Sequence, residues 1–146
     1  MGSAQGRRPD DGTVGAALRL DAYPRTRLGL PDGAELEVAI ADTFVRRLRG
    51  LAWLAEPPAL SLLIPRCTSV HTVGMRFAID VAFLTWPGQD RVARVLGVRE
   101  SVAPLRVAAL PRKGRSVPAS EIATLELPAG QAVALGLRVG VELPHT

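Results

Sequence analysis

The chain of 146 residues has little of what a disulfide scaffold, a zinc cage or a base-stacking surface requires. Cys67 is its one cysteine, which excludes an intramolecular disulfide and a cysteine-based zinc site. Aromatic residues make up 4% of the sequence, too few for a surface that stacks single-stranded bases. No apolar run approaches the roughly 20 residues of a membrane-spanning helix. We therefore expect a cytoplasmic, globular monomer without a membrane span.

Lysine and asparagine are also scarce, because Lys113 is the one lysine and asparagine is absent. Such arginine-biased usage is typical of GC-rich coding, so the net charge of +4 is weak evidence for a nucleic-acid partner, and none is expected. The charge is concentrated in the segment Arg91–Arg115, where seven basic residues accompany one acid, Glu100. This segment predicts either a solvated basic face or contact with a small anionic ligand or a protein partner.

Hydrophobic periodicity divides the chain into short strands and two short helices. Leu36, Val38 and Ile40 alternate with polar or small residues, which predicts a strand over Ala34–Ala41. The other predicted strands are short apolar runs bounded by turn residues: Leu60–Ile64, Ile79–Thr85, Arg91–Arg99, Ile122–Leu127 and Val139–Leu143. The predicted helices have helical apolar spacing and a glycine near their ends: Asp42–Leu51 and Ala129–Leu135.

Short strands joined by proline and glycine turns indicate a β-rich α+β fold. We predict a single compact domain over residues 16–146, with a strongly bent, mostly antiparallel sheet or small barrel and two short helices. Residues 1–15 have no periodicity and are expected to form a disordered leader. Between the predicted strands, Ser101–Ser120 reads as a long irregular connection with one extended piece at Val107–Leu110, and its length indicates a functional loop.

The densest group of chemically capable residues lies between two predicted buried strands, from Cys67 to Asp80. His71 could act as a base, a ligand contact or a structural hydrogen-bonding group. Asp80 precedes a buried strand, so its carboxylate must be paired, with Arg76, His71 or loop amides as candidate partners. A nucleophilic Cys67–His71 pair or a metal site that uses both with Asp80 has little support, so neither a metal nor another cofactor is expected.

The predicted hairpin also suggests which segments meet. Its two strands run in opposite directions, so the segment before the first and the segment after the second emerge at the same end. His71–Asp80 and Arg99–Arg115 are therefore expected to share one face. The candidate ligand-binding residues are His71, Thr72, Met75, Asp80, Arg99 and Arg106.

Four sequence motifs occur together in an order that resembles a known family. They are Ala41-Asp-Thr followed by Arg-Leu-Arg-Gly-Leu51, the central segment Cys67–Asp80, Leu125-Glu-Leu-Pro-Ala-Gly130, and Gly136-Leu-Arg-Val-Gly140. Over Glu35–Leu143 the chain resembles the bacterial and archaeal family called domain of unknown function 192, although Ala78 replaces a usual Pro and Val141 a usual Asp. The resemblance implies a compact β-rich fold, directs attention to His71, Met75 and Asp80, and supplies no reaction.

These observations favour a noncatalytic binding or accessory module, since no paired carboxylates, supported nucleophile or full metal set is found. Two other functions stay open. One is a hydrolase in which His71 and Asp80 are catalytic and Thr72, Ser69 or Cys67 is the nucleophile. The other is a structural partner of a secretion or envelope assembly, docked through a sheet edge.

The isolated position of Cys67 generates a first prediction. Because no supported partner activates its thiol, replacing Cys67 with Ser or Ala should leave folding and ligand binding nearly unchanged. Labelling kinetics with a thiol reagent at neutral pH check this expectation. Rapid stoichiometric labelling, as a reactive thiolate would give, would show that Cys67 has a chemical role.

Overall fold

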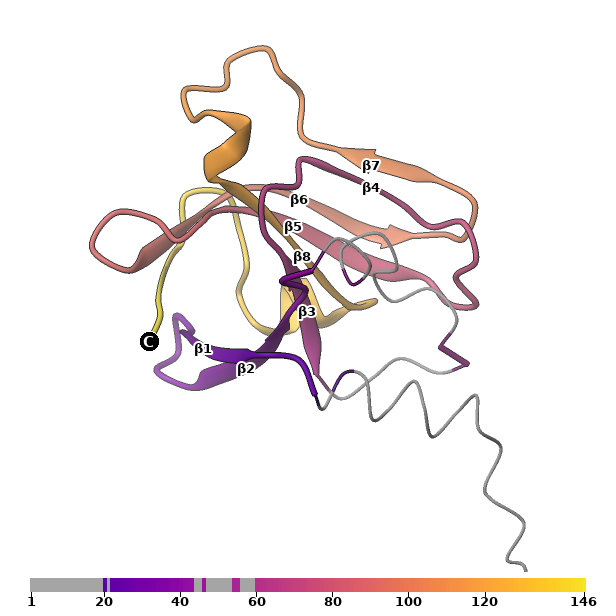
Figure 1. Cartoon of the computed structure of the whole chain (residues 1–146), viewed down its shortest axis with the longest axis horizontal. Coiled ribbons are helices and arrows are strands. Elements are labelled where there is room, and N and C mark those ends of the chain that lie inside the picture. The colour runs from indigo at the N-terminus through magenta and orange to yellow at the C-terminus, as the bar shows by residue number, and fades with distance from the viewer. Residues whose placement is uncertain (1–19, 21, 44–45, 47–53, 56–59) are drawn as a thin grey trace, which may run out of the picture.

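The computed structural model describes residues 20, 22–43, 46, 54–55 and 60–146. Their main element is a seven-stranded sheet that curves almost into a barrel (Figure 1). Its strands are, in spatial order, β1 (Arg25–Gly29), β2 (Glu35–Ile40), β3 (Ser61–Ile64), β8 (Ile122–Pro128), β5 (Ile79–Thr85), β6 (Val92–Val102) and β9 (Glu142–Pro144). The expected leader, residues 1–15, lies outside the described residues. So does most of the expected helix at Asp42–Leu51.

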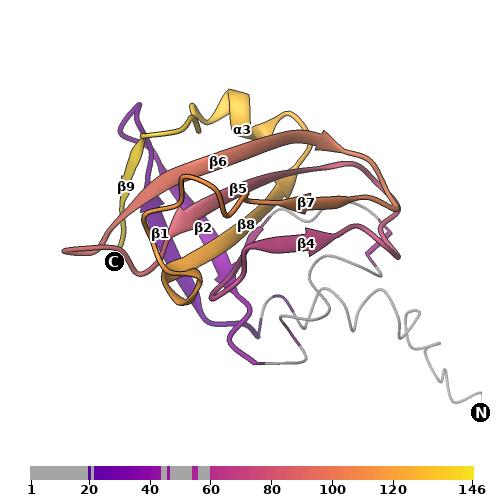
Figure 2. The same cartoon turned by 90° about the horizontal axis from the view of Figure 1, so that it is seen from above.

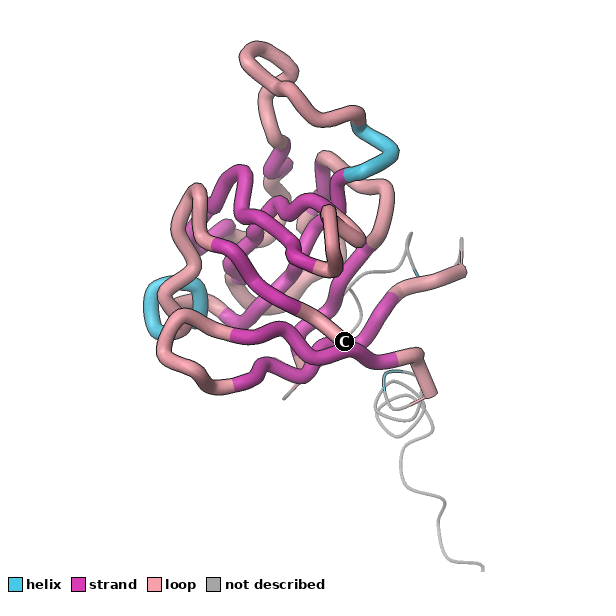
Figure 3. Tube along the Cα trace, turned by 90° about the vertical axis from the view of Figure 1, so that its left-hand side faces the viewer, coloured by secondary structure: helices cyan, strands magenta, loops and turns pink. Residues whose placement is uncertain are grey.

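The two edge strands of this sheet, β1 and β9, come together at the C-terminal segment. Leu28 of β1 forms an isolated antiparallel bridge with His145, which directly follows β9. Figure 3 shows the C-terminus beside strands of the sheet. The Thr26 hydroxyl also donates a hydrogen bond of 2.7 Å to the Thr146 carbonyl. The β2–β3 pairing is parallel and the other pairings in this sheet are antiparallel. The prediction of a strongly bent, mostly antiparallel β-rich fold is thus confirmed in its general form.

Alternating side chains give the sheet two apolar sides. On β5, Ala82 and Leu84 face an inner core to which every strand of the main sheet contributes, which places this core inside the barrel. Ile79, Val81 and Phe83 face the opposite way and form an outer core with residues of β3 and β8. Because both sides of β5 are apolar, the outside of the barrel needs a cover at this point.

A separate two-stranded sheet supplies that cover. It consists of β4 (Ser69–His71) and β7 (Val107–Ala109), which pair antiparallel and lie over β5 and β6 (Figure 2). Val70 and Ala108 point inward into the outer core. The packing is close, because a Cβ added at Gly97 of β6 would lie 2.9 Å from Cδ1 of Leu110. The sequence predicted extended structure at the second strand and missed the first.

The described part of the chain contains less helix than expected. Gln131–Ala134 forms the short helix α3, within the predicted range, and Ala119–Glu121 forms the single 3-10 turn η1. The expectation of two short helices is therefore not confirmed. None of the described helices combines the length and hydropathy required to cross a membrane. The strand expected over Val139–Leu143 begins only at Glu142.

Asp80 ties three elements together from inside the fold. Its side chain is fully buried, and its Oδ1 accepts a hydrogen bond of 2.8 Å from the Ser101 amide near the end of β6. Its Oδ2 accepts one of 2.9 Å from the Ala132 amide in α3. Both partners are backbone amides, but they belong to β6 and α3, whereas the partners expected from the sequence were Arg76, His71 or amides of the loop before β5. The carboxylate thus fixes β6 and α3 to β5.

The position of Asp80 predicts a large loss of stability on its removal. Asp80→Ala leaves the part-buried Ser101 amide and the buried Ala132 amide without acceptors and should lower the free energy of unfolding by about 2 to 4 kcal/mol. Asp80→Asn keeps one acceptor oxygen and should lose less. Urea unfolding of both variants measures the difference, with Glu100→Ala as an exposed control. A loss below about 0.5 kcal/mol for Asp80→Ala would show that the carboxylate does not hold these elements.

Candidate functional site

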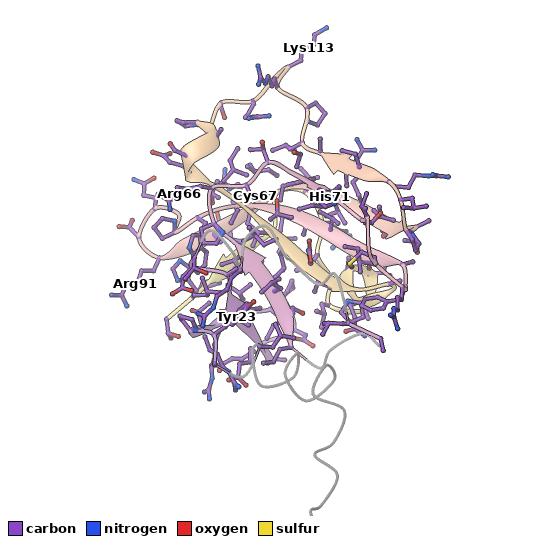
Figure 4. The ribbon with its side chains drawn as sticks, turned by 45° about the vertical axis from the view of Figure 1, so that its right-hand side comes forward. Tyr23, Arg66, Cys67, His71, Arg91 and Lys113 are labelled. Carbon is purple, nitrogen blue, oxygen red and sulfur yellow. The ribbon has the colours of Figure 1, made fainter. Side chains whose placement is uncertain are left out.

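His71 lies on the outward side of β4, at the surface of the covering layer (Figure 4). Its register partner is Val107 of β7. The neighbouring pairs carry the hydrogen bonds, because the Thr72 amide donates to the Arg106 carbonyl and the Leu110 amide donates to the Thr68 carbonyl. His71 and Val107 therefore form a non-hydrogen-bonded pair, in which opposing side chains approach most closely.

Thr72 holds the loop that precedes β7. Its side chain is fully buried, and its hydroxyl donates a hydrogen bond of 2.7 Å to the Ala103 carbonyl while it accepts one of 2.7 Å from the Arg106 amide. Its carbonyl accepts hydrogen bonds from the amides of Leu105 and Met75. Leu105 has a positive φ of 62°. Thr72 thus fixes a backbone turn that is unusual for a leucine and places Arg106 beside β4.

Large apolar side chains are exposed close to His71, at its partner Val107 in β7 and in the turns that follow β4 and precede β7. The described residues include five exposed large apolar side chains, and three of them lie here. The exposed fraction is 55% for Val73, 68% for Leu105 and 72% for Val107. Arg106 stands between the last two in sequence and is also exposed. We call the group His71, Val73, Leu105, Arg106 and Val107 the β4–β7 face. It combines protruding apolar surface with one permanent cation.

The remaining candidate residues from the sequence are not on this face. Met75 is 8% exposed and packs in the outer core. Asp80 shares the inner side of β5 with Ala82, whereas the β4–β7 face lies beyond the outer core. Arg99 is exposed on β6, opposite Val81. The structure thus brings Arg106 next to β4 but separates the His71 imidazole from the Asp80 carboxylate, which the hydrolase alternative would need at one point.

Cys67 has structural contacts. Its thiol donates a hydrogen bond of 3.1 Å to the Ser69 carbonyl, and its side chain packs against the outer core. The Cys67 carbonyl accepts a hydrogen bond of 2.9 Å from the Thr124 hydroxyl. In the described part of the chain, no three His, Cys, Asp or Glu side chains come together as a metal would require. These contacts support a role for Cys67 in joining β4 to β8.

Leu105, Val107 and Val73 were not among the candidate residues from the sequence. The apolar run Val107–Leu110 predicted an extended segment, but it did not predict which of its side chains are buried and which are exposed. The missing information is the β4 partner, since pairing with β4 turns Ala108 inward and Val107 outward. The one available signal was the positively charged, apolar composition of Leu105–Val107, which is uncommon for a segment that is fully buried.

Two solved structures have a similar fold. A protein of unknown function from Novosphingobium aromaticivorans aligns with a TM-score of 0.61 and 18% identity, covering 84% of this chain and 83% of that chain. A protein from Sinorhizobium meliloti, described as a candidate transcription regulator, aligns with a TM-score of 0.56 and 21% identity, covering 85% and 94%. At these identities the similarity concerns the fold.

Sequence comparison identifies the family of the chain. No curated protein matches the chain. The model of the domain of unknown function 192, described as uncharacterized ACR, matches residues 29–145, which contain every described strand from β2 to β9. The match agrees with the resemblance that the four sequence motifs indicated. The chain therefore belongs to the family of domain of unknown function 192.

Proposed function

We propose that the protein is a noncatalytic binding module whose β4–β7 face takes an anionic segment of a protein partner. The observation that carries this proposal is the exposure of Val73, Leu105 and Val107 around His71 and Arg106. Monomeric proteins rarely gather large apolar side chains at the surface without a use for them. The charged and polar groups of the face favour an anionic partner, because the face has a guanidinium and an imidazole and no carboxylate.

The shape of the face favours a partner segment over a small enclosed ligand. Val107 projects from β7, Val73 and Leu105 lie in the adjoining turns, and each of these side chains is more than half exposed. Aliphatic side chains of an acidic partner segment can cover Val107 and Leu105, and a carboxylate between them can meet Arg106. The guanidinium is available for such a contact, since within the described part of the chain it donates one hydrogen bond, a long one of 3.3 Å to the carbonyl of the preceding residue.

Peptide titration tests the proposed function. The acetylated, amidated peptide Leu-Glu-Leu-Glu-Leu should shift the NMR resonances of His71, Arg106 and Val107 together, with a response that weakens as salt rises. Arg106→Gln and Val107→Ala should each lower its affinity by about threefold to tenfold, since each removes an exposed contact worth about 1 kcal/mol. Arg138→Gln, which removes an exposed charge from the segment after α3, is the matched control and should bind normally.

Other outcomes of this titration would contradict the proposal. Equal binding by the matched peptide with lysine in place of glutamate would show that the face does not select negative charge. Shifts confined to residues outside the β4–β7 face would place the site elsewhere. If inorganic phosphate alone reproduced the shifts with the same affinity, the occupant would be a small anion and not a partner segment.

Thr72 allows a second test that leaves the contacting side chains intact. Thr72→Val removes the hydroxyl that bonds Ala103 and Arg106 and should release the loop before β7. We expect weaker binding of the acidic peptide together with a loss of about 1 to 3 kcal/mol of stability. Thr72→Ser restores the hydroxyl and should recover most of the affinity. If both variants bind like the unchanged protein, loop position does not determine the site.

A further inference from the structure

A groove on another part of the surface has a different character. Its volume is about 820 Å³, within the range of ligand sites in proteins of about 300–1,000 Å³. It lies between the β5–β6 hairpin and the connection that follows β7, with β9 at one end. None of the residues that line it belongs to the β4–β7 face. At this place the sequence predicts only a turn, Pro87–Asp90.

The floor of the groove is the outward side of β6. Ala93 and Val95 point into the inner core, so Val92, Arg94 and Leu96 point out along the floor. At about 3.3 Å per residue these three positions span about 13 Å. The groove is thus elongated along a strand, with the hairpin tip at one end and the apolar side chain of Leu96 at the other.

The lining is acidic, although the whole chain carries a net charge of +4. Its charged residues are Asp90, Arg94, Glu121 and Glu142. Arg94 is already engaged, because its Nη2 lies 2.9 Å from Oε1 of Glu142. Asp90 and Glu121 are exposed carboxylates, one at the hairpin tip and one in η1. A ligand in this groove therefore meets an excess of negative charge at separated points.

Backbone contacts hold the two walls in place before any ligand arrives. The Trp86 amide of the hairpin donates a hydrogen bond of 2.9 Å to the Glu121 carbonyl, which continues the β5–β8 pairing beside the groove. The Trp86 ring packs on the His145 ring, with centroids 4.3 Å apart. The His145 amide donates a 2.9 Å hydrogen bond to the Arg91 carbonyl and so holds the second strand of the hairpin. A groove with fixed walls loses little conformational entropy on binding.

We propose that this groove binds an extended, basic segment of a protein partner. Alternate side chains of such a segment point the same way, so cationic residues can reach Asp90 and Glu121 while an apolar residue reaches Leu96 and Val117. A single small amine could satisfy only one of the separated carboxylates. The length of the groove, its negative charge and its apolar end together favour an extended basic peptide over a small amine.

Fluorescence of Trp86 provides a direct test on the full chain. In the Trp53→Phe background, Trp86 is the one tryptophan. The acetylated, amidated peptide Arg-Ala-Arg-Ala-Leu should shift its emission, and affinity should fall as ionic strength rises. Asp90→Asn combined with Glu121→Gln should weaken binding about tenfold, which corresponds to about 1.4 kcal/mol. Glu100→Gln, an exposed position on β6 outside the groove, is the control and should leave the affinity unchanged.

Three results would overturn the proposal. Equal binding of Glu-Ala-Glu-Ala-Leu would show that the acidic lining does not select charge. Equal binding of free arginine amide would show that a small cation, and not a segment, is the occupant. Unchanged affinity in the Asp90→Asn, Glu121→Gln variant would place the basic peptide elsewhere. Because both substituted carboxylates are exposed, the variant should fold, and its circular dichroism and unfolding midpoint verify this.

Discussion

Strand β5 is buried on both faces, and this burial determines where the covering layer and the candidate site lie. Neither side of β5 can face water, because Ala82 and Leu84 on one side pack in the barrel interior and Phe83 on the other side needs a second layer to cover it. The β4–β7 sheet is that layer. A two-stranded sheet has its own outward side, and this side carries the candidate site. His71 is thus at the surface because it belongs to the layer that covers the outer side of β5.

Buried polar residues join these layers, and this explains why the candidate residues from the sequence separate in space. Asp80 and Thr72 stand out in the sequence as chemically capable groups, but both are fully buried with their polar atoms bonded to backbone. Their removal would leave amides without acceptors, so their main effect is on stability and loop position. His71, which projects from the layer that they support, is the member of this group available to a partner.

Much of the main sheet could be predicted from the sequence because its strands have strong local signals. The alternation in Glu35–Ile40 and the apolar run in Ile79–Thr85 exist before any tertiary contact forms. Ser69–His71 lacks such a signal, since three residues become a strand only by pairing with Val107–Ala109 far along the chain. The same distant pairing decides that Val107 is exposed, so the candidate site could be predicted only in part, through His71 and Arg106.

The connection from Ala103 to Glu121 carries part of both proposed surfaces and is fixed at both ends. Thr72 holds its start, the Trp86 amide bonds its end at Glu121, and the Arg115 guanidinium donates a hydrogen bond of 2.8 Å back to the Leu110 carbonyl in between. Coupling between two sites needs an element with two alternative arrangements. A connection held at three points favours one arrangement. The geometry therefore favours two independent surfaces of opposite charge on one scaffold, able to hold an acidic and a basic segment at the same time.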